Sequence, residues 1–435
     1  MERARDLPSV DEVLRRIPHL RSLPQSFLVG EIRAVLGDKR AALRNHGAAD
    51  DISIEDAVEE RVNALLTPSL RRVINATGVI LHTNLGRAPL VDFKAIGGYS
   101  NLEYDLESGQ RGKRDVHTAG LLRRLLGRDA IVVNNNAAAA YLVLHELAAG
   151  GDVIVSRGEL IEIGDGFRVP EIMARSGALL REVGTTNRTR AEDYENAIDE
   201  KTRLIMCVHR SNFRITGFTS TPDLASVSSV GKRRGIPVYQ DLGSGCFFDL
   251  RPQGISEPTV MAMLGAGVNV VSFSCDKLLG GPQSGIIAGD GELITRIRRN
   301  PMYRAFRVDK LVIQTLEETL RHVLKQEWNA IPTLRMITTG LDELQTRAER
   351  VAHRVKGRAV QAVSVIGGGS TPEQALPTWA VELEPRSASQ FEQALRRGAP
   401  PVIARIERER VILDMRTVAE DDEESLIAAV IAIND

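Results

Sequence analysis

The sequence has few of the features that mark a secreted or metal-stabilised protein. Its three cysteines, Cys207, Cys246 and Cys275, lie far apart in 435 residues and form no CxxC pair. This odd, scattered set argues against a disulfide framework or a structural zinc site, and it suits a reducing compartment. The eight histidines are scattered as well and indicate no metal site.

Long apolar runs and net charge are also lacking. The longest aliphatic stretch covers residues 426–433, well short of the roughly 20 residues that a transmembrane helix needs. Residues 1–6 lead into no apolar segment of the kind found in signal peptides. The formal net charge of -1 provides no overall field for nucleic acid, so any RNA contact must come from local patches. We therefore expect a soluble, cytoplasmic protein.

The chain does contain alternating helix and strand patterns, over a length that predicts two or three domains. Residues 1–66 predict three short amphipathic helices, the first with Ser9 as N-cap and Glu12 completing a capping box. The second helix is expected at about 26–46 and the third from Asp51 to Leu66. We expect this helical domain to end at the break formed by residues 67–69.

Residues 67–310 predict a large α/β domain. Continuous aliphatic runs separated by helical stretches are typical of a mostly parallel sheet that is covered on both faces. The runs lie at 130–133, 152–155, 204–208, 237–240 and 268–272. After them, a long helical pattern at about 311–357 leads into a smaller C-terminal α+β domain, 311–435, with strands at 380–383 and 411–414.

Lys277 follows the last of these runs and precedes a glycine-rich turn at Gly280 and Gly281. Burial at such a place removes water from the amine, lowers its pKa and makes the neutral amine available for a Schiff base. For a lysine taken alone, a solvated turn is the alternative. The polar residues that follow the other strands favour the first interpretation, because ligands bind at the carboxyl ends of parallel strands.

Asp241 ends the run at 237–240, where its carboxylate could pair with a pyridinium nitrogen; a helix N-cap is the alternative. The helix start at Asn135, Asn136 and Ala137 could hold a phosphate ester. Ser272 and Ser274 could add hydroxyl donors. The order of phosphate loop, aspartate and lysine segment resembles that of fold-type I, aminotransferase-like enzymes. We therefore predict pyridoxal 5'-phosphate as the cofactor.

The ring of this cofactor needs a stacking partner, and the sequence shows no obvious aromatic residue for that position. His209, at a strand end, is the candidate. A capping or core histidine is the alternative at this position. Two glycine pairs, at 243–245 and 289–291, belong to no full GxGxxG motif, so we interpret them as turns.

The sequence further resembles the bacterial selenocysteine synthases, the L-seryl-tRNA(Sec) selenium transferases, in blocks that follow one another along nearly the whole chain. The blocks lie at 7–10, 72–90, 99–106, 132–137, 156–159, 211–214, 272–285, 304–310, 367–370 and 400–403. Shorter relatives that act on free amino or sugar acids typically lack the N-terminal helices. This chain has them.

The resemblance implies conversion of L-seryl-tRNA(Sec) to L-selenocysteinyl-tRNA(Sec) with selenophosphate, through loss of water to an aminoacrylyl-tRNA and addition of selenium. Lys277 would act as the base, and Asp241 would keep the cofactor ring protonated. Asp276 would assist proton transfer; a turn residue bonded to the Gly280–Gly281 backbone is its alternative.

The anionic selenium donor calls for bidentate cations. Arg87, Arg304 and Arg307 match the family's anion-binding arginines, and a solvated helix face is the alternative for the last two. The family forms ring-shaped decamers built from dimers. We therefore expect a homo-oligomer, in which Arg87 or the Arg304 and Arg307 pair could act on the cofactor of the neighbouring subunit.

The N-terminal helical domain is expected to bind tRNA. Residues 1–66 have no basic balance, with ten Lys and Arg against twelve Asp and Glu. Local clusters of basic residues suit contacts with an RNA backbone and would equally suit solvated helix faces. These residues are Arg15, Arg16, Arg21, Lys39, Arg40, Arg44, Arg71 and Arg72.

Two other functions stay open at this point. A pyridoxal-phosphate-dependent lyase or racemase of a free amino or sugar acid would turn over without RNA and tolerate deletion of residues 1–66. A non-catalytic tRNA-binding paralogue would be expected to lose Lys277 or Asp241, and both are present.

Overall fold

The computed structural model describes residues 7–44, 52–163, 166–210, 215–367 and 374–434. By its internal contacts the chain divides into two compact units, Met1–Arg72 and Val73–Asp435. The matching block at 211–214 and most of the block at 367–370 lie outside the described residues, as do residues 1–6 and 45–51 of the predicted helical domain. The predicted domain boundaries at 66/67 and 310/311 remain predictions.

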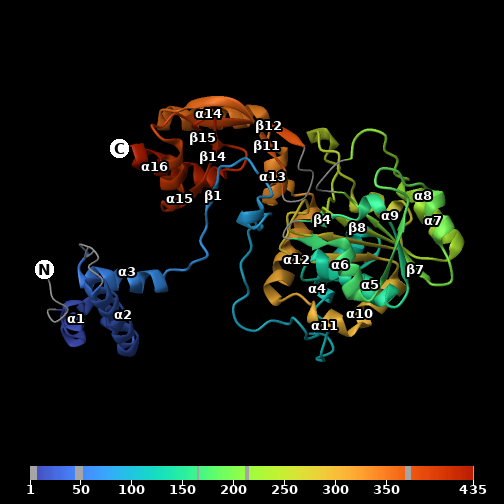
Figure 1. The fold of residues 1–435 in the computed structure, drawn as a ribbon, viewed down its shortest axis with the longest axis horizontal. Coiled ribbons are helices and arrows are strands. Elements are labelled where there is room, and N and C mark those ends of the chain that lie inside the picture. Colours follow the sequence, from blue (N-terminus) through green and yellow to red (C-terminus); the bar gives the residue numbers. More distant parts are fainter. Residues whose placement is uncertain (1–6, 45–51, 164–165, 211–214, 368–373, 435) are drawn as a thin grey trace. The chain divides into compact units, whose positions relative to one another are not determined.

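The N-terminal unit is helical, as predicted (Figure 1). It comprises α1 (Val10–Arg16), the 3-10 helix η1 (Pro18–Ser22), α2 (Gln25–Arg44) and α3 (Ile54–Leu66). The predicted capping box is present, since the Ser9 hydroxyl accepts the Glu12 N–H at 3.3 Å and the Glu12 carboxylate accepts the Ser9 N–H at 2.7 Å. Apolar residues from all three helices form one small core.

The second unit is built on a seven-stranded sheet with the order β2-β10-β9-β8-β7-β3-β6. β10 is antiparallel to both of its neighbours, and the remaining pairs are parallel, so the predicted mostly parallel sheet is confirmed. The sequence did not predict β6, a half-exposed edge strand with a mixed pattern. The strands are β2 (Asp129–Val133), β10 (Gly285–Gly289), β9 (Val270–Ser274), β8 (Val238–Gly243), β7 (Thr202–Val208), β3 (Asp152–Ser156) and β6 (Leu179–Val183).

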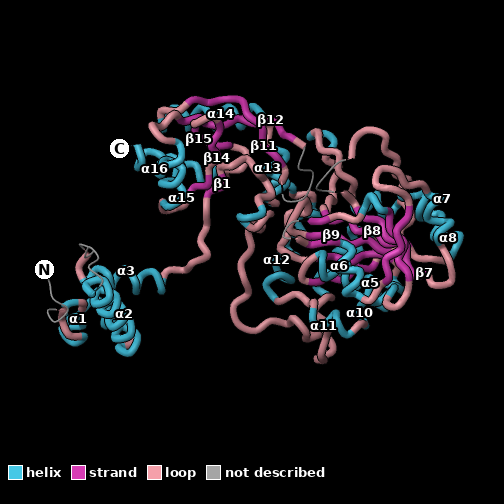
Figure 2. Tube along the Cα trace, in the orientation of Figure 1, coloured by secondary structure: helices cyan, strands magenta, loops and turns pink. Residues whose placement is uncertain are grey.

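Helices cover both faces of this sheet, because alternate strand residues enter two separate cores (Figure 2). One core includes Ala130 and Val132 of β2, and the other includes Ile131 and Val133. The first face is covered by α4 (Val116–Leu126), α7 (Ala191–Ala197), α8 (Leu224–Arg234), α9 (Val260–Gly265) and α12 (Lys310–Lys325). The second is covered by α5 (Asn136–Ala148), α6 (Val169–Ser176), α10 (Gly291–Arg299) and α11 (Pro301–Ala305).

The long helical pattern predicted for 311–357 is divided in the structure. α12 ends at Lys325 and is capped by Gln326, which has a left-handed backbone, and α13 (Pro332–Thr338) and α14 (Leu341–Val355) follow. The 3-10 helix η5 (Trp328–Ala330) lies between α12 and α13. α12 packs into a core of the large sheet, whereas α14 packs into the core of the C-terminal part.

The C-terminal part contains a four-stranded antiparallel sheet with the order β11-β12-β15-β14. Its strands are β11 (Arg358–Val365), β12 (Ala375–Leu383), β15 (Arg410–Asp414) and β14 (Arg405–Glu407). α15 (Ala388–Arg397) and α16 (Glu423–Asn434) join α14 in its core. The predicted strands at 380–383 and 411–414 lie within β12 and β15. A short parallel pair, β1 (Ile74–Asn75) with β13 (Val402–Ile403), attaches the start of this unit to its end.

The remaining elements are short. They are the hairpin β4 (Glu162–Ile163) and β5 (Phe167–Arg168), and the 3-10 helices η2 (Thr83–Leu85), η3 (Arg157–Glu159), η4 (Arg251–Gln253) and η6 (Glu420–Asp422). In the part of the chain that the structure describes, no helix is both long enough and apolar enough to cross a membrane. The same residues contain no group of three or more His, Cys, Asp or Glu side chains arranged to hold a metal.

Candidate active site

The predicted site residues gather at the carboxyl edge of the large sheet. Lys277 comes three residues after β9, His209 follows β7 directly, and α5 begins three residues after β2. Asp241 lies in β8 and pairs in register with Ser272 of β9. Because these strands are parallel, their ends meet at one edge, where α/β proteins bind ligands.

Lys277 is held in a tight turn at this edge. Its carbonyl accepts the Gly280 N–H at 2.9 Å, and the neighbouring Leu278 N–H donates to the Ser244 carbonyl at 3.1 Å. Gly280 has a φ of 75°, and a β-carbon there would lie 2.4 Å from a methyl group of Ile331, so only glycine fits. The glycine at position 280 is therefore required because the turn after Lys277 packs closely against Ile331.

The side chain of Lys277 is almost fully buried, with 6% of the residue exposed. Burial, and then the nearby Arg87 guanidinium, lower the pKa of Lys277, while Asp276, Asp241 and Glu257 oppose the shift. No hydrogen bond or ion pair from the described residues reaches its amine. The predicted burial is therefore confirmed, and the amine is available to a ligand.

Asp241 lies inside β8, which excludes its alternative as a helix N-cap. Its carboxylate accepts a hydrogen bond from Asn136 Nδ2 at 2.8 Å, and its carbonyl accepts the His209 N–H at 2.8 Å. Burial raises the pKa of Asp241, and the bond from Asn136 and the charge of Lys277 oppose that shift. Ser272, predicted as a hydroxyl donor for the phosphate, is fully buried, and its Oγ lies 2.7 Å from the Tyr239 hydroxyl.

The start of α5 is capped by Asn135, whose Oδ1 accepts the Ala138 N–H at 2.8 Å. The first N–H groups of a helix have no intrahelical partner, so those of Asn136 and Ala137 are the donors that a phosphate would use. Gly285 of β10 allows this arrangement, because a β-carbon there would lie 2.3 Å from the Asn135 carbonyl oxygen. Ser274, the last residue of β9, is buried at the same edge.

Asp276 and Arg87 form an ion pair, with Arg87 Nη1 2.7 Å from Asp276 Oδ2. The Asp276 carbonyl also accepts the Ala88 N–H at 3.2 Å. The alternative for Asp276, a bond to the turn backbone, is excluded because the Gly281 N–H donates to the Cys275 carbonyl and the Gly280 N–H to that of Lys277. The structure therefore brings one predicted anion-binding arginine next to the lysine.

Arg307 and Arg304 belong to the segment around Phe306, which is hydrogen-bonded to the residue that precedes the N-cap of α5. The Phe306 carbonyl accepts the Asn134 N–H at 2.9 Å, which places Arg307 beside the start of α5. Arg307 Nη1 is 3.4 Å from Glu103 Oε1, and Arg304 is exposed on α11. Within the described residues, no hydrogen bond or ion pair joins these two arginines to Lys277, Asp241 or Arg87.

Three glutamates at this edge were missed by sequence reasoning. Glu103 accepts hydrogen bonds from Arg114 at 2.8 and 2.9 Å in addition to facing Arg307. Glu159 is buried and accepts the Val208 N–H at 2.9 Å, and burial raises its pKa to about 7. Glu257 is buried with Oε1 3.0 Å from His209 Nε2. Glu103 and Glu159 lie in blocks of the family resemblance, whereas nothing local marks Glu257.

The site fits pyridoxal phosphate in three respects. A buried, unpaired amine suits its aldehyde, a buried carboxylate suits its ring nitrogen, and a helix N-terminus suits its phosphate. Polar atoms buried nearby also have no hydrogen-bond partner among the described residues, as expected where a ligand supplies partners. These atoms are Arg87 Nε, Asn136 Oδ1 and Ser244 Oγ. His209 Nε2 and Glu257 Oε1 also form no hydrogen bond with the described residues, and they lie 3.0 Å from each other.

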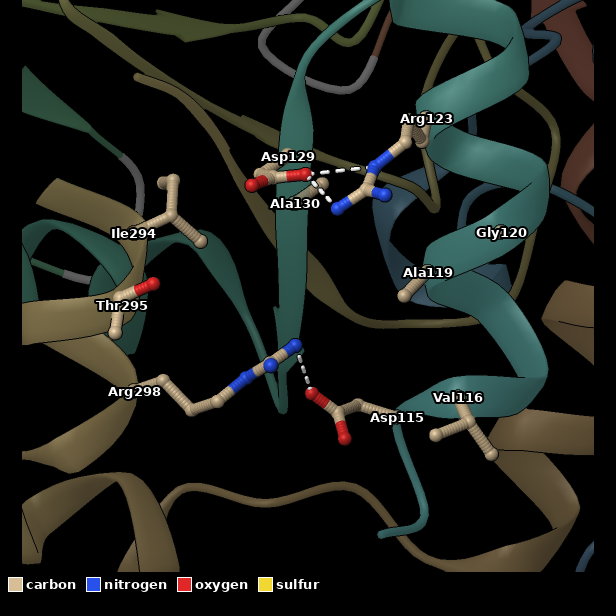
Figure 3. A pocket seen from close by; sticks show the side chains of 10 residues that line it. All are labelled: Asp115, Val116, Ala119, Gly120, Arg123, Asp129, Ala130, Ile294, Thr295 and Arg298. Atoms are coloured by element: carbon tan, nitrogen blue, oxygen red, sulfur yellow. Dashed lines mark hydrogen bonds and ion pairs between the residues drawn. The ribbon is translucent and has the colours of Figure 1, made fainter. Parts of the chain in front are cut away.

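A cavity of about 280 Å³ lies beside β2, the outermost strand of the sheet (Figure 3). α4 and α10 flank it, and Arg298 of α10 contacts Asp115 at the start of α4. Arg123 Nε donates to Asp129 Oδ1 at 2.7 Å. Each charged group lining this cavity therefore faces an opposite charge of the protein itself, and the cavity contains none of the predicted site residues.

Comparison with known proteins agrees with this geometry. A family model described as L-seryl-tRNA selenium transferase matches residues 73–419. The L-seryl-tRNA(Sec) selenium transferase of Geobacter metallireducens is 44% identical and covers 99% of each chain, and that of Aquifex aeolicus is 42% identical and covers 96% of each. Among solved structures, D-glucosaminate-6-phosphate ammonia-lyase matches with a TM-score of 0.57 and 18% identity, covering 86% of this chain and 99% of its own. That likeness concerns the fold alone, and the predicted fold-type I class is confirmed.

Proposed function

Because the chain belongs to the L-seryl-tRNA selenium transferase family, we propose that it converts L-seryl-tRNA(Sec) to L-selenocysteinyl-tRNA(Sec) with pyridoxal 5'-phosphate as cofactor. The observation that carries the chemistry is Lys277, a buried amine without a bonded partner at the carboxyl edge of the sheet. Selenophosphate is proposed as the selenium donor.

Bound pyridoxal phosphate would supply an electron sink for the negative charge that develops at the substrate carbon next to the amino group. Lys277 would hold the cofactor until the seryl amino group takes the place of its Nζ, and the freed Nζ would then accept the proton from the seryl Cα, a role that its lowered pKa supports. Asp241 would face the ring nitrogen, with Asn136 fixing one carboxylate oxygen. The N–H groups of Asn136 and Ala137 would bind the phosphate.

Asp276 and Arg87 would serve the second half of the reaction. Arg87 is already paired with Asp276 beside the lysine, so an anionic selenium donor would share its guanidinium with that carboxylate. Arg304, exposed on α11, and Arg307, close to the phosphate loop, would bind the same donor. A homo-oligomer is proposed as well, in the family's form of a decamer built from dimers, in which Arg87 or the Arg304 and Arg307 pair would act on the cofactor of a neighbouring subunit.

The N-terminal unit would bind the tRNA. Its helices bury a small core and leave basic side chains such as Arg15 and Arg40 exposed, and these can contact RNA phosphates. The curated relatives align along 96% or more of this chain, which supports a tRNA-dependent reaction over a lyase of a free acid. An aminoacyl-tRNA substrate also supports a cytoplasmic location.

The test is to incubate the purified protein, loaded with pyridoxal phosphate, with seryl-tRNA(Sec) and selenophosphate and to measure selenocysteinyl-tRNA. We expect product with the full chain and none from free serine. A chain that lacks residues 1–66 should keep its bound cofactor and lose turnover of the tRNA. Turnover of a free amino or sugar acid without RNA, and no product from seryl-tRNA, would contradict the proposal.

A further inference from the structure

Glu257 is a buried carboxylate at the active-site edge to which the proposed mechanism gives no role. Only 2% of its side chain is exposed, and its Oε1 has no hydrogen-bond partner among the described residues. The Nε2 of His209 lies 3.0 Å from that oxygen. A buried carboxylate is costly unless a positive or hydrogen-bonding group compensates it, and the imidazole is the group in contact with it.

The backbone around Glu257 is fixed on both sides. The Ser256 N–H donates to the Gln374 side chain at 2.8 Å, and the Ile255 N–H donates to the Leu250 carbonyl at 3.0 Å. On the other side, Thr259 caps α9, and the Val260 N–H donates to the Cys246 carbonyl at 2.8 Å. The carboxylate of Glu257 is therefore held in place from a rigid loop.

The backbone of His209 is held by a hydrogen bond, whereas its imidazole ring is partly exposed. Its N–H donates to the carbonyl of Asp241, and the preceding residue, Val208, is held by the carboxylate of Glu159. About a quarter of the His209 side chain remains exposed. With the backbone held by two site strands, the remaining freedom is rotation of the imidazole, and Glu257 is the charged group in contact with its Nε2.

We propose that Glu257 is a positioning residue that orients the imidazole of His209 through Nε2, so that the ring presents a fixed face to the cofactor. Metal-binding histidines are oriented in this way by carboxylates that contact the ring nitrogen not bound to the metal. Glu257 then acts on cofactor binding only through His209. The inference rests on the proposed cofactor, and it adds a residue that neither the sequence motifs nor the mechanism contains.

A double-mutant cycle tests this dependence. Glu257→Gln, His209→Gln and the double variant are prepared without cofactor, and the dissociation constant for pyridoxal phosphate is measured by titration of the visible absorbance. Loss of a carboxylate that orients a metal-binding histidine typically costs about 10- to 100-fold in metal affinity or activity, and we take the lower end for a ring that only stacks on its ligand. We expect each single variant to bind roughly tenfold more weakly, and the double variant to bind no more weakly than His209→Gln alone.

Asp115→Asn is the matched control, since Asp115 is a buried carboxylate that lines the cavity beside β2 and contacts none of the predicted site residues. It should leave the cofactor affinity unchanged. Glu257→Asp, which keeps the charge but shortens its reach, should fall between wild type and Glu257→Gln and provides a second variant if the latter folds poorly. Effects of Glu257→Gln and His209→Gln that multiply in the double variant would overturn the inference, as would an unchanged affinity in Glu257→Gln. Absence of a visible band in the wild type would instead contradict the proposed function.

Discussion

The carboxyl edge of the large sheet and the cavity beside its outermost strand β2 both place charged side chains in partly or fully buried positions, and the two regions differ in how those charges are paired. In the cavity beside β2, Arg298 faces Asp115 and Arg123 faces Asp129, so the protein supplies both members of each pair (Figure 3). At the carboxyl edge, Lys277 is buried without a bonded partner.

The difference follows from the cost of burying charge. A paired charge keeps its ionised form, whereas an unpaired buried amine responds by a lowered pKa. Burial alone does not distinguish a ligand-binding site, because Asp115 is as buried as Lys277. Lys277 differs from Asp115 in that none of the described residues forms a hydrogen bond or ion pair with its amine. A cavity lined by self-paired charges offers little to a ligand, and a buried group without a partner marks where a ligand supplies one.

The largest expected effect is at the carboxyl edge. Lys277→Ala removes the amine that would hold the cofactor and carry the proton, so selenocysteinyl-tRNA formation should fall by about 10³-fold or more. The visible absorbance of protein mixed with pyridoxal phosphate should also be lost. Lys325→Ala is the matched control, since Lys325 is exposed on α12 and pairs with Glu327. Survival of the visible band in Lys277→Ala would refute the assignment.

A second prediction concerns Glu159, a buried carboxylate whose pKa is raised to about 7 from 4.5. Because the folded pKa lies above the unfolded one, the stabilising contribution is full below pH 4.5 and is lost as the pH rises to about 7. That contribution amounts to roughly 3 kcal/mol. Glu159→Gln retains an acceptor for the Val208 N–H and should lack this pH dependence. Melting temperatures of both proteins between pH 5 and pH 8 measure it, and parallel curves would contradict the prediction.

In the cavity beside β2, Arg298→Ala would leave the Asp115 carboxylate buried and unpaired. Loss of one member of a fully buried pair costs more than loss of a surface pair, and Arg298 is about one-third exposed, so we expect destabilisation by roughly 1–3 kcal/mol. Asp115→Asn in the same chain should recover part of the loss. Denaturant unfolding measures the stability. Activity per folded molecule should not change, and a large loss of activity would break the contrast between the cavity and the active site.

The smallest effect is expected for Arg123→Ala. This guanidinium is mostly exposed, and its pair with Asp129 is the kind of surface ion pair that contributes little. We expect a change in stability within about 0.5 kcal/mol and unaltered activity. A loss of stability as large as that of Arg298→Ala would show that solvent exposure does not explain the difference between the two ion pairs. The dependence of the unfolding midpoint on salt concentration would then measure the electrostatic contribution.

Sequence patterns predicted the parallel strands, the helix caps and the lysine turn, because each depends on residues close together in the chain. Ser9 with Glu12 and Asn135 cap helices, and the latter was predicted as a phosphate ligand without its capping role. Gly280 marks a turn that only glycine fits. These features are set by local backbone geometry.

Other features depend on contacts between distant segments and could not be read from the sequence. The pairing of Glu257 with His209 and of Glu103 with Arg307 joins residues from separate loops. Ser272 was predicted as a phosphate donor, but the strand register places it opposite Asp241, and its hydroxyl meets Tyr239. The long helix predicted after residue 310 is interrupted in the structure, first at Gln326, which has a left-handed backbone, and then before Pro332. Where the helix breaks depends on the different cores that α12 and α14 join.

The pairing of β1 with β13 has a consequence for the order in which the chain can fold. The Ile74 N–H donates to the Pro401 carbonyl, and the Gly78 N–H donates to the Thr417 hydroxyl, 339 residues later. During synthesis from the N-terminus, these partners leave the ribosome long after Ile74 and Gly78 have emerged. The strand β1 must therefore wait for β13, and closing so long a loop carries an entropic cost that local contacts do not. The N-terminal helices have no such delay, since their core lies within the first 62 residues.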